Sequence, residues 1–179
     1  MPGLGRPRQH QGMRVLVLAA SRHGSTTEIA AAIAEALVRR GLDADANAIE
    51  DATPQRYDAV VLGSGVYMGH WLEPARRFAE QHAAALVERP VWLFSSGPLG
   101  PPEHLVPEGD PVDVAALLEA TGARGHRVFA GRLRKKGLGF GERAMVAAVH
   151  APEGDFRDWD AIDAWAGEIA HALATVPRA

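Results

Sequence analysis

Apolar residues along this chain form short continuous runs that alternate with helical stripes. Residues 14–20 read RVLVLAA, and a continuous apolar run of this length is typical of a strand covered on both faces of a parallel sheet. A helix is predicted over 26–40, because Ile29, Ile33 and Leu37 recur every fourth residue with alanines between them. A strand, a tight turn and a helix in succession predict the opening of a βαβ unit.

The same alternation continues toward the end of the chain. Later apolar runs are short and bounded by turn residues, whereas the segments between them carry apolar residues at helical spacing. We expect further strands at 43–48, 59–64, 91–95 and 127–133, and further helices at 74–87, 112–120 and 158–176. Five strands alternating with helices predict an α/β fold with a doubly wound parallel sheet and helices on both faces.

Three stretches fall outside this alternation. Residues 98–111 hold five of the 12 prolines of the chain, so we expect a loop there. Residues 137–157 begin with a glycine-rich stretch that precedes the apolar run 145–149. This segment could form either a further turn of helix or a sixth strand at the edge of the sheet. We interpret residues 1–12 as a disordered tail, which leaves 13–179 as one domain.

Composition narrows the class of protein. A length of 179 residues fits one domain, and the absence of cysteine excludes disulfides, thiolate metal ligands and a cysteine nucleophile. The absence of cysteine is also compatible with the cytoplasmic location that we expect. A net charge of -3 does not indicate a nucleic-acid partner, and no apolar run reaches the about 18 residues of a membrane span. Peripheral contact with a membrane and a homodimer both stay open.

Although the net charge of the chain is close to neutral, one segment contains a cluster of basic residues. It consists of Arg132, Arg134, Lys135, Lys136 and Arg143. A short run of like charges is commonly the solvated end of a strand. The alternative is a docking surface for an anionic substrate or partner.

The turn after the first predicted strand reads SRHGSTT over residues 21–27. Backbone N–H groups and the positive end of the following helix converge at such a turn. Four hydroxyl side chains lie in these seven residues, and Gly24 allows the backbone to curl without a Cβ clash. The segment therefore predicts a phosphate cradle, although serine and threonine before a helix also serve simply as N-caps.

Two more glycine-rich segments follow later strands and meet the same edge of the predicted sheet. Residues 63–71 read GSGVYMGHW, where glycines let the backbone approach a flat ligand and Tyr67 and Trp71 are candidates to stack on it. The alternative is a turn whose aromatic side chains cap the core. Residues 95–100 read SSGPLG and are expected to close the other side of the crevice, where ligands bind in sheets of this kind.

Three of these motifs together carry a resemblance to a known family. Residues 21–26 (SRHGST), 63–70 (GSGVYMGH) and 94–100 (FSSGPLG) resemble the flavodoxin-domain family that includes the bacterial menaquinone-dependent protoporphyrinogen IX dehydrogenases. The likeness runs from about Met13 to Val176. It implies a strand order of 2-1-3-4-5 and noncovalently bound FMN. Two departures are His23, where flavodoxins carry threonine or serine, and the lack of the strong acidity typical of flavodoxins that shuttle electrons.

The resemblance implies which residues contact FMN, with 21–26 at its phosphate and 64–70 and 96–100 beside its isoalloxazine ring. The cofactor-binding residues implied are Ser21, Arg22, His23, Gly24, Ser25, Thr26, Ser64, Gly65, Val66, Tyr67, Met68, Gly69, Ser96, Gly97, Pro98, Leu99 and Gly100. Tyr67 and His70 are the catalytic candidates on the reacting face, with His70 as a proton donor or acceptor. A structural histidine bonded to the backbone is an equal alternative for His70.

Three functions fit these patterns. The first is an FMN-dependent oxidoreductase of the quinone-linked, protoporphyrinogen-dehydrogenase-like type, in which a quinone or a porphyrinogen is a partner. The second is an electron-transfer protein without its own substrate, as flavodoxins are. The third is a ligand-binding protein that kept the fold and no longer binds flavin. Hydrolase and zinc-peptidase chemistry are not supported, because neither G-x-S-x-G nor H-E-x-x-H occurs.

Overall fold

A five-stranded parallel sheet forms the centre of the protein. The computed structural model describes residues 12–97, 112–148, 150 and 152–176. The parallel strands are β1 (Arg14–Ala20), β2 (Asp43–Asn47), β3 (Ala59–Tyr67), β5 (Val91–Ser96) and β6 (His126–Phe129). Their order is β2-β1-β3-β5-β6, which confirms the predicted order 2-1-3-4-5. A two-residue strand, β4 (His70–Trp71), pairs antiparallel with the end of β3.

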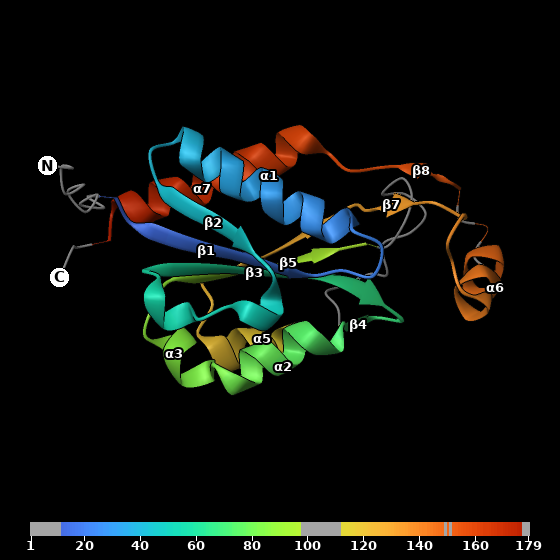
Figure 1. The fold of residues 1–179 in the computed structure, drawn as a ribbon, viewed down its shortest axis with the longest axis horizontal. Coiled ribbons are helices and arrows are strands. Elements are labelled where there is room, and N and C mark those ends of the chain that lie inside the picture. The colour runs from blue at the N-terminus through green and yellow to red at the C-terminus, as the bar shows by residue number, and fades with distance from the viewer. Residues whose placement is uncertain (1–11, 98–111, 149, 151, 177–179) are drawn as a thin grey trace, which may run out of the picture.

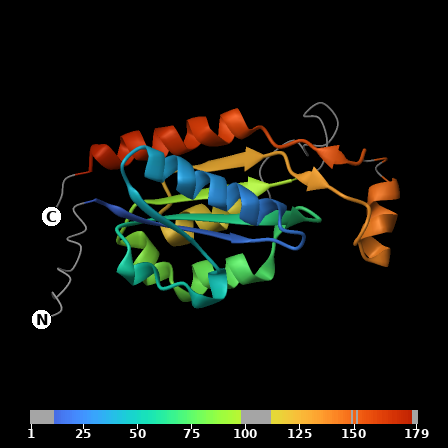
Figure 2. The ribbon, with the colours of Figure 1, turned by 45° about the horizontal axis from the view of Figure 1, so that its top comes forward.

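Helices cover both faces of this sheet (Figures 1 and 2). One layer contains α1 (Ser25–Arg39) and α7 (Trp159–Ala174). The opposite layer contains α2 (Glu73–Gln81), α3 (Ala83–Val87) and α5 (Val114–Thr121), with the short 3₁₀ turns Ile49–Asp51 and Pro54–Arg56 at its margin. The predicted doubly wound architecture is therefore confirmed.

The continuous apolar run of β1 is explained by this three-layer arrangement. Successive side chains of a strand point to opposite faces of the sheet. Val15 and Val17 accordingly belong to the apolar cluster beneath α1 and α7, whereas Leu16 and Leu18 belong to the cluster beneath α2 and α5. All four side chains are fully buried. A strand covered on both faces needs apolar residues at every position, as the sequence predicted.

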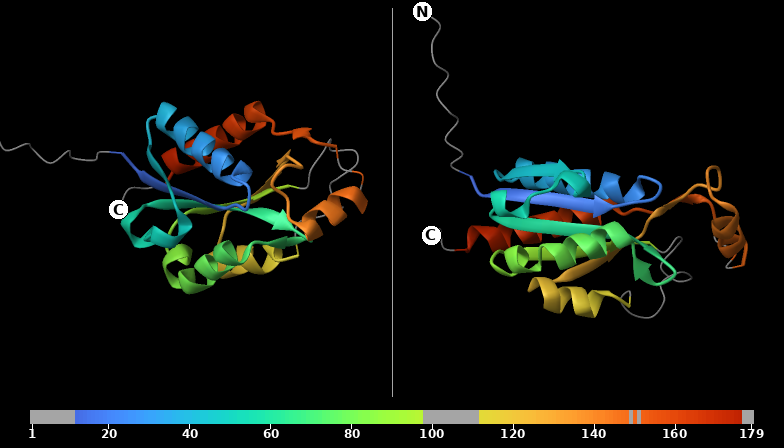
Figure 3. Two further views of the ribbon diagram at one scale, coloured as in Figure 1. Left: turned by 45° about the vertical axis from the view of Figure 1, so that its right-hand side comes forward. Right: turned by 60° about the horizontal axis from the view of Figure 1, so that its bottom comes forward.

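An arm formed by residues 132–157 extends from the carboxyl-terminal edge of the sheet. It begins with β7 (Arg132–Leu133), continues through α6 (Phe140–Ala148) and returns by β8 (Gly154–Asp155). Its two strands pair antiparallel in a sheet of their own. Figure 3 shows α6 standing away from both helical layers, beyond the ends of the main strands.

Several predicted boundaries were wrong. The helix predicted over 74–87 is divided at His82, whose backbone (φ -109°, ψ 12°) leaves the helical path. The strand predicted over 127–133 is divided into β6 and β7, because the pairing with β5 ends at Ser96 and Phe129. Strand β7 pairs with β8 instead. Of the two alternatives for 145–149, the helix is observed as far as residue 148.

Two expectations concern segments outside the described residues. The disordered tail was assigned to residues 1–12, of which only Gly12 is described. The loop predicted at 98–111 lies outside them altogether.

Candidate functional site

The three motif segments meet at the carboxyl-terminal edge of the sheet. The last residue of β1, Ala20, is in register with Ser64 of β3, and Gly65 of β3 is in register with Ser96 of β5. The segments that follow these strands are thus neighbours in space. This is the edge at which open α/β sheets bind their ligands.

The turn between β1 and α1 presents an uncapped helix N-terminus. Its N-cap residue is Gly24, which adopts a left-handed conformation (φ 81°) and provides no side-chain hydrogen bond. The helix therefore does not use a serine or threonine as its cap, which was the alternative to phosphate binding. The N–H groups of its first turn have no intrahelical partner, and they carry the positive end of the helix dipole.

Two hydroxyl side chains lie buried beneath this turn. Ser25 accepts a hydrogen bond from the backbone N–H of Arg132 (3.2 Å), which leaves its own hydroxyl hydrogen available. Thr26 makes no side-chain hydrogen bond to any residue that the structure describes. A Cβ added at Gly65 would lie 3.3 Å from Thr26 Oγ1. The glycine thus keeps the space in front of this hydroxyl open.

Residues 22 and 23 are held by the arm. The guanidinium of Arg22 lies 4.1 Å from the centre of the Tyr67 ring, a distance typical of a cation–π contact. Arg22 also approaches Glu142 Oε1 at 3.4 Å, and His23 Nε2 lies 3.0 Å from the same oxygen. His23, which the resemblance places at the phosphate, therefore contacts a carboxylate of α6.

Glu142 was not identified from the sequence. Its pKa is lowered, first by the hydrogen bond that it accepts from the backbone N–H of Gly139 (2.8 Å) and then by His23. The carboxylate is therefore ionised at neutral pH, 119 residues away in sequence from the histidine that it contacts. No local pattern indicates such a pair.

The segment after β3 forms a tight hairpin rather than an open glycine-rich loop. Tyr67 pairs with His70, and both residues between them have positive φ, 51° at Met68 and 80° at Gly69, as a type I′ turn requires. Directly paired residues project from the same face of a hairpin, and their sequence neighbours project from the other. Tyr67 and His70 therefore share one face.

The other face of the hairpin belongs to the core. Trp71 is 2% exposed and its Nε1–H donates to Ser95 Oγ (2.8 Å). Trp71 is thus a core residue, which leaves Tyr67 as the aromatic candidate for ligand contact. Ser64 is also committed internally, because its Oγ accepts from the N–H of Leu72 (2.9 Å) and donates to the carbonyl of Gly65 (2.8 Å).

The segment after β5 is described only at its start. Ser96 is buried, and Gly97 has a positive φ of 103° while its N–H donates to the carbonyl of Phe129. The glycine lets the chain turn sharply away from the sheet at this point. Pro98, Leu99 and Gly100 lie outside the described residues.

His70 contacts a carboxylate rather than the backbone. Its Nδ1 lies 3.2 Å from each carboxylate oxygen of Asp113. Asp113 also accepts a hydrogen bond from the N–H of Trp71 (2.9 Å). Asp113 follows the proline-rich stretch and carries no motif of its own, so it was not identified from the sequence.

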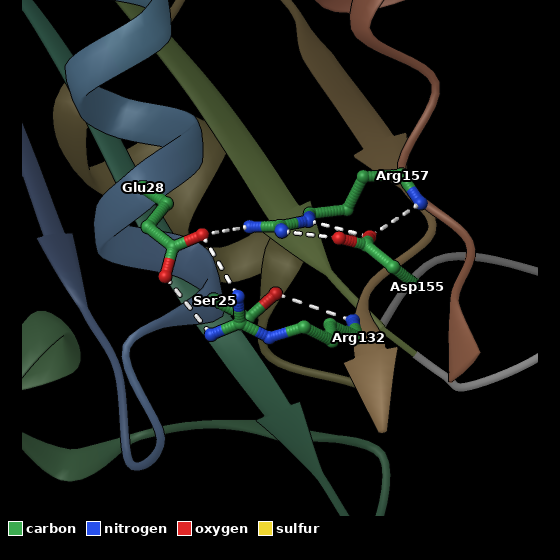
Figure 4. A network of polar contacts seen from close by, with 5 residues as sticks. All are labelled: Ser25, Glu28, Arg132, Asp155 and Arg157. Atoms are coloured by element: carbon green, nitrogen blue, oxygen red, sulfur yellow. Dashed lines mark hydrogen bonds and ion pairs between the residues drawn. The ribbon is translucent and has the colours of Figure 1, made fainter. Parts of the chain in front are cut away.

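The base of the arm is fixed to α1 by a network of charges (Figure 4). Glu28 accepts hydrogen bonds from the guanidinium groups of both Arg132 and Arg157, and Arg157 also binds Asp155. The pKa of Glu28 is lowered, chiefly by Arg157. Arg132 is therefore paired with Glu28 and is not merely the solvated end of a strand.

The rest of the basic cluster faces solvent. Its exposed members are Arg134, Lys135, Lys136 and Arg143. The described residues contain no helix that is both long and apolar enough to cross a membrane. Within the same residues, no three histidine or acidic side chains gather in a way that would hold a metal ion.

Comparison with known proteins identifies the family. A family model described as a flavodoxin domain matches residues 16–160. The protoporphyrinogen IX dehydrogenase (quinone) of Escherichia coli strain K12 is 28% identical over 173 residues, which cover 89% of this chain and 96% of that relative.

Solved structures agree on the fold. A flavodoxin from the domain Archaea superimposes with a TM-score of 0.63 at 16% identity, covering 90% of this chain and 99% of that one. Oxidised flavodoxin 1 from Bacillus cereus gives a TM-score of 0.59 at 15% identity, covering 92% and 99%. The family model, which matches residues 16–160, shows that this chain belongs to the flavodoxin domain family.

Proposed function

We propose that this protein is an FMN-dependent oxidoreductase, similar to quinone-linked protoporphyrinogen dehydrogenases. The observation that carries the proposal is the uncapped N-terminus of α1, where the buried hydroxyls of Ser25 and Thr26 lie beneath a left-handed Gly24. The relative from Escherichia coli, whose name specifies both a quinone and protoporphyrinogen IX, supports the reaction class.

The residues of the turn fit a phosphate group. Free N–H groups at a helix N-terminus and unpaired hydroxyls are the donors that a phosphate requires, and no lysine is needed. Arg22 and His23 are already paired with the carboxylate of Glu142, so the donors left for a phosphate are the backbone N–H groups and the hydroxyls. The hydroxyl of Thr26, a residue that is 3% exposed, makes no hydrogen bond to the described residues, so it is free to donate to such a ligand.

The hairpin would flank the ring system of the cofactor. Tyr67 is tied to the phosphate turn through Arg22, so the two segments are held in a fixed relation. When bound, FMN would supply the redox chemistry between a reduced substrate and a quinone. The protein would orient the reactants and exchange protons, and His70 on the same face as Tyr67 is the candidate for proton exchange.

The cofactor assignment is tested by comparing hydroxyls on the same helix. Ser25→Ala combined with Thr26→Ala should weaken FMN binding by about 3–6 kcal/mol, at about 1.5–3 kcal/mol for each hydrogen bond to a charged group. Thr27→Ala is the matched control, because the Thr27 side chain is exposed. Flavin fluorescence titration measures both. Equal affinity in the double variant and the control would remove the phosphate assignment.

The reaction class is tested on the purified protein. A flavin absorption spectrum, with FMN released on heating, excludes a protein that has lost its cofactor. Rapid bleaching of that spectrum by protoporphyrinogen or menaquinol supports the oxidoreductase. Bleaching by a reductase of the ferredoxin type alone would instead indicate an electron carrier.

A further inference from the structure

Asp113 occupies a helix cap position without capping its helix. It is the N-cap residue of α5, yet its side chain makes no hydrogen bond to that helix. An aspartate at this position ordinarily stabilises its own helix by about 1 kcal/mol. Here both carboxylate oxygens turn to the hairpin, toward His70 Nδ1 and the N–H of Trp71. The carboxylate thus forms its hydrogen bonds with the hairpin and not with the helix.

The contact is more than an accidental pair of surface charges. The Asp113 side chain is 18% exposed, against 51% for His70, so the carboxylate forms the inner, shielded partner. A second link joins the same two segments, because the N–H of Val112 donates to the carbonyl of Gly69 (2.9 Å). Three contacts between the two segments therefore hold the carboxylate in place beside the imidazole. An isolated pair of surface charges has no such additional contacts.

This geometry determines which nitrogen of His70 carries a proton. A neutral imidazole has one donor and one acceptor nitrogen, and the partner of one nitrogen decides the state of the other. A carboxylate at Nδ1 selects the tautomer with the hydrogen on Nδ1. The lone pair then lies on Nε2, which makes no hydrogen bond to the described part of the chain.

We propose that Asp113 is a positioning residue that fixes the ring orientation and tautomer of His70, so that Nε2 is the atom that exchanges a proton at the site. The inference rests on the proposed function, since it assigns His70 to the reacting face. His70 and Tyr67 project from the same face of the hairpin, and Tyr67 contacts Arg22 of the phosphate turn. A fixed Nε2 therefore lies beside the proposed cofactor site, on a rigid two-residue turn.

The test reads the tautomer directly, in FMN-loaded protein labelled with ¹⁵N at histidine. Two-bond N–H correlation spectra distinguish the two neutral tautomers, and His70→Gln identifies the signals of His70. In the wild type, His70 should carry its hydrogen on Nδ1. Asp113→Ala should reverse the ratio toward the Nε2–H form, because no acceptor remains at Nδ1. Asp113→Asn, which keeps an acceptor for the N–H of Trp71, should give a smaller shift in the same direction.

The control is Glu119→Ala, which removes a carboxylate from an exposed position of the same helix. It should leave the His70 signals unchanged. An Nε2–H tautomer in the wild type, or a ratio that Asp113→Ala and Asp113→Asn do not alter, overturns the proposal. Near-UV circular dichroism reports whether the hairpin around Trp71 survives, and the Asn variant decides the question if the Ala variant does not fold.

Turnover separates this inference from the proposed function. Where quinone-linked turnover is found, Asp113→Asn should lower kcat about tenfold with KM little changed, as is typical when the partner that orients a histidine is lost. Where the wild type shows no turnover, the proposed reaction is refuted, while the tautomer ratios still decide the role of Asp113.

Discussion

The sheet with its two helical layers and the arm of residues 132–157 are held together by different forces. The sheet buries two apolar clusters, one on each face, whose strand residues are almost completely excluded from solvent. Apart from Leu133 at its base, which is buried, the arm is joined to the rest of the protein by charged and polar groups, at Glu28 near its base and at Arg22 and His23 near α6. Its helix α6 also leaves Phe140 93% exposed.

The sheet and the arm therefore obtain their shapes from different interactions. Burial of apolar area is non-directional and stabilises the sheet as a whole. Ion pairs between partly exposed groups contribute little energy but define a relative position. The groups that position the arm include the turn proposed to hold phosphate. The placement of α6 and the geometry of that turn are therefore linked in the structure.

Replacing one phenylalanine in each region should give the largest difference in the free energy of unfolding. Phe94 is fully buried, and a Cβ at its register partner Gly63 would lie only 2.1 Å from the ring. We expect Phe94→Ala to lower the free energy of unfolding by about 3–5 kcal/mol, since it leaves a cavity in the core. Phe140→Ala should change it by less than about 0.5 kcal/mol. Urea titration measures both, and similar values for the two variants would contradict the comparison.

A smaller loss of stability is expected when the charge network at the base of the arm is broken. The Arg157 side chain is 3% exposed, contacts Glu28 and Asp155, and stacks on Trp159 with its guanidinium 4.5 Å from the ring centre. Arg157→Met removes the hydrogen bonds to both carboxylates and should lower the free energy of unfolding by about 1–3 kcal/mol. The loss stays within this range because the two carboxylates are half-exposed and can be hydrated instead. The matched control is Arg143→Met on α6, where the side chain is exposed. An equal loss in both would show that the network does not hold the arm.

Acid should weaken the same network. Hydrogen bonds from Arg157 lower the pKa of Asp155 from 3.8 to about 2, and the pKa of Glu28 is lowered too. A carboxylate with a lower pKa in the folded state stabilises the fold above its unfolded pKa, and this contribution is lost as the pH falls from about 4 to 2. Because Asp155 is 42% exposed, we expect about 1 kcal/mol or less. Urea titrations across this range should show a smaller loss in Arg157→Met than in the wild type, because Asp163, whose pKa is lowered by Arg40 and Arg39, titrates in both.

The smallest effect on stability should come from Glu142. Glu142→Gln removes the charge that pairs with Arg22 and His23, and we expect a change below about 0.5 kcal/mol in the free energy of unfolding. The arm should nevertheless be cleaved faster by trypsin at its exposed lysines and arginines, because α6 loses its link to the phosphate turn. Glu35→Gln on the exposed side of α1 is the control. Unchanged cleavage of the arm would show that this contact does not hold α6.

The sequence determined the fold because each local signal agreed with the tertiary arrangement. The apolar run of β1 predicted a strand covered on both faces, and Val15 to Leu18 are indeed divided between two buried clusters. The alternation of strands and helices then predicted the doubly wound sheet and its order. The position of the turn after β1 followed from the same periodicity.

Only the tertiary structure decided which of the candidate side chains face the site. Tyr67 and Trp71 looked alike in the sequence, but the pairing of β3 with β4 sends Trp71 into the core. Asp113 and Glu142 carry no motif, and they reach His70 and His23 across 43 and 119 residues of chain. Periodicity reports which face of an element is buried, whereas a contact between distant charges depends on how the elements pack. That packing is why the arm and both carboxylates were found only in the folded protein.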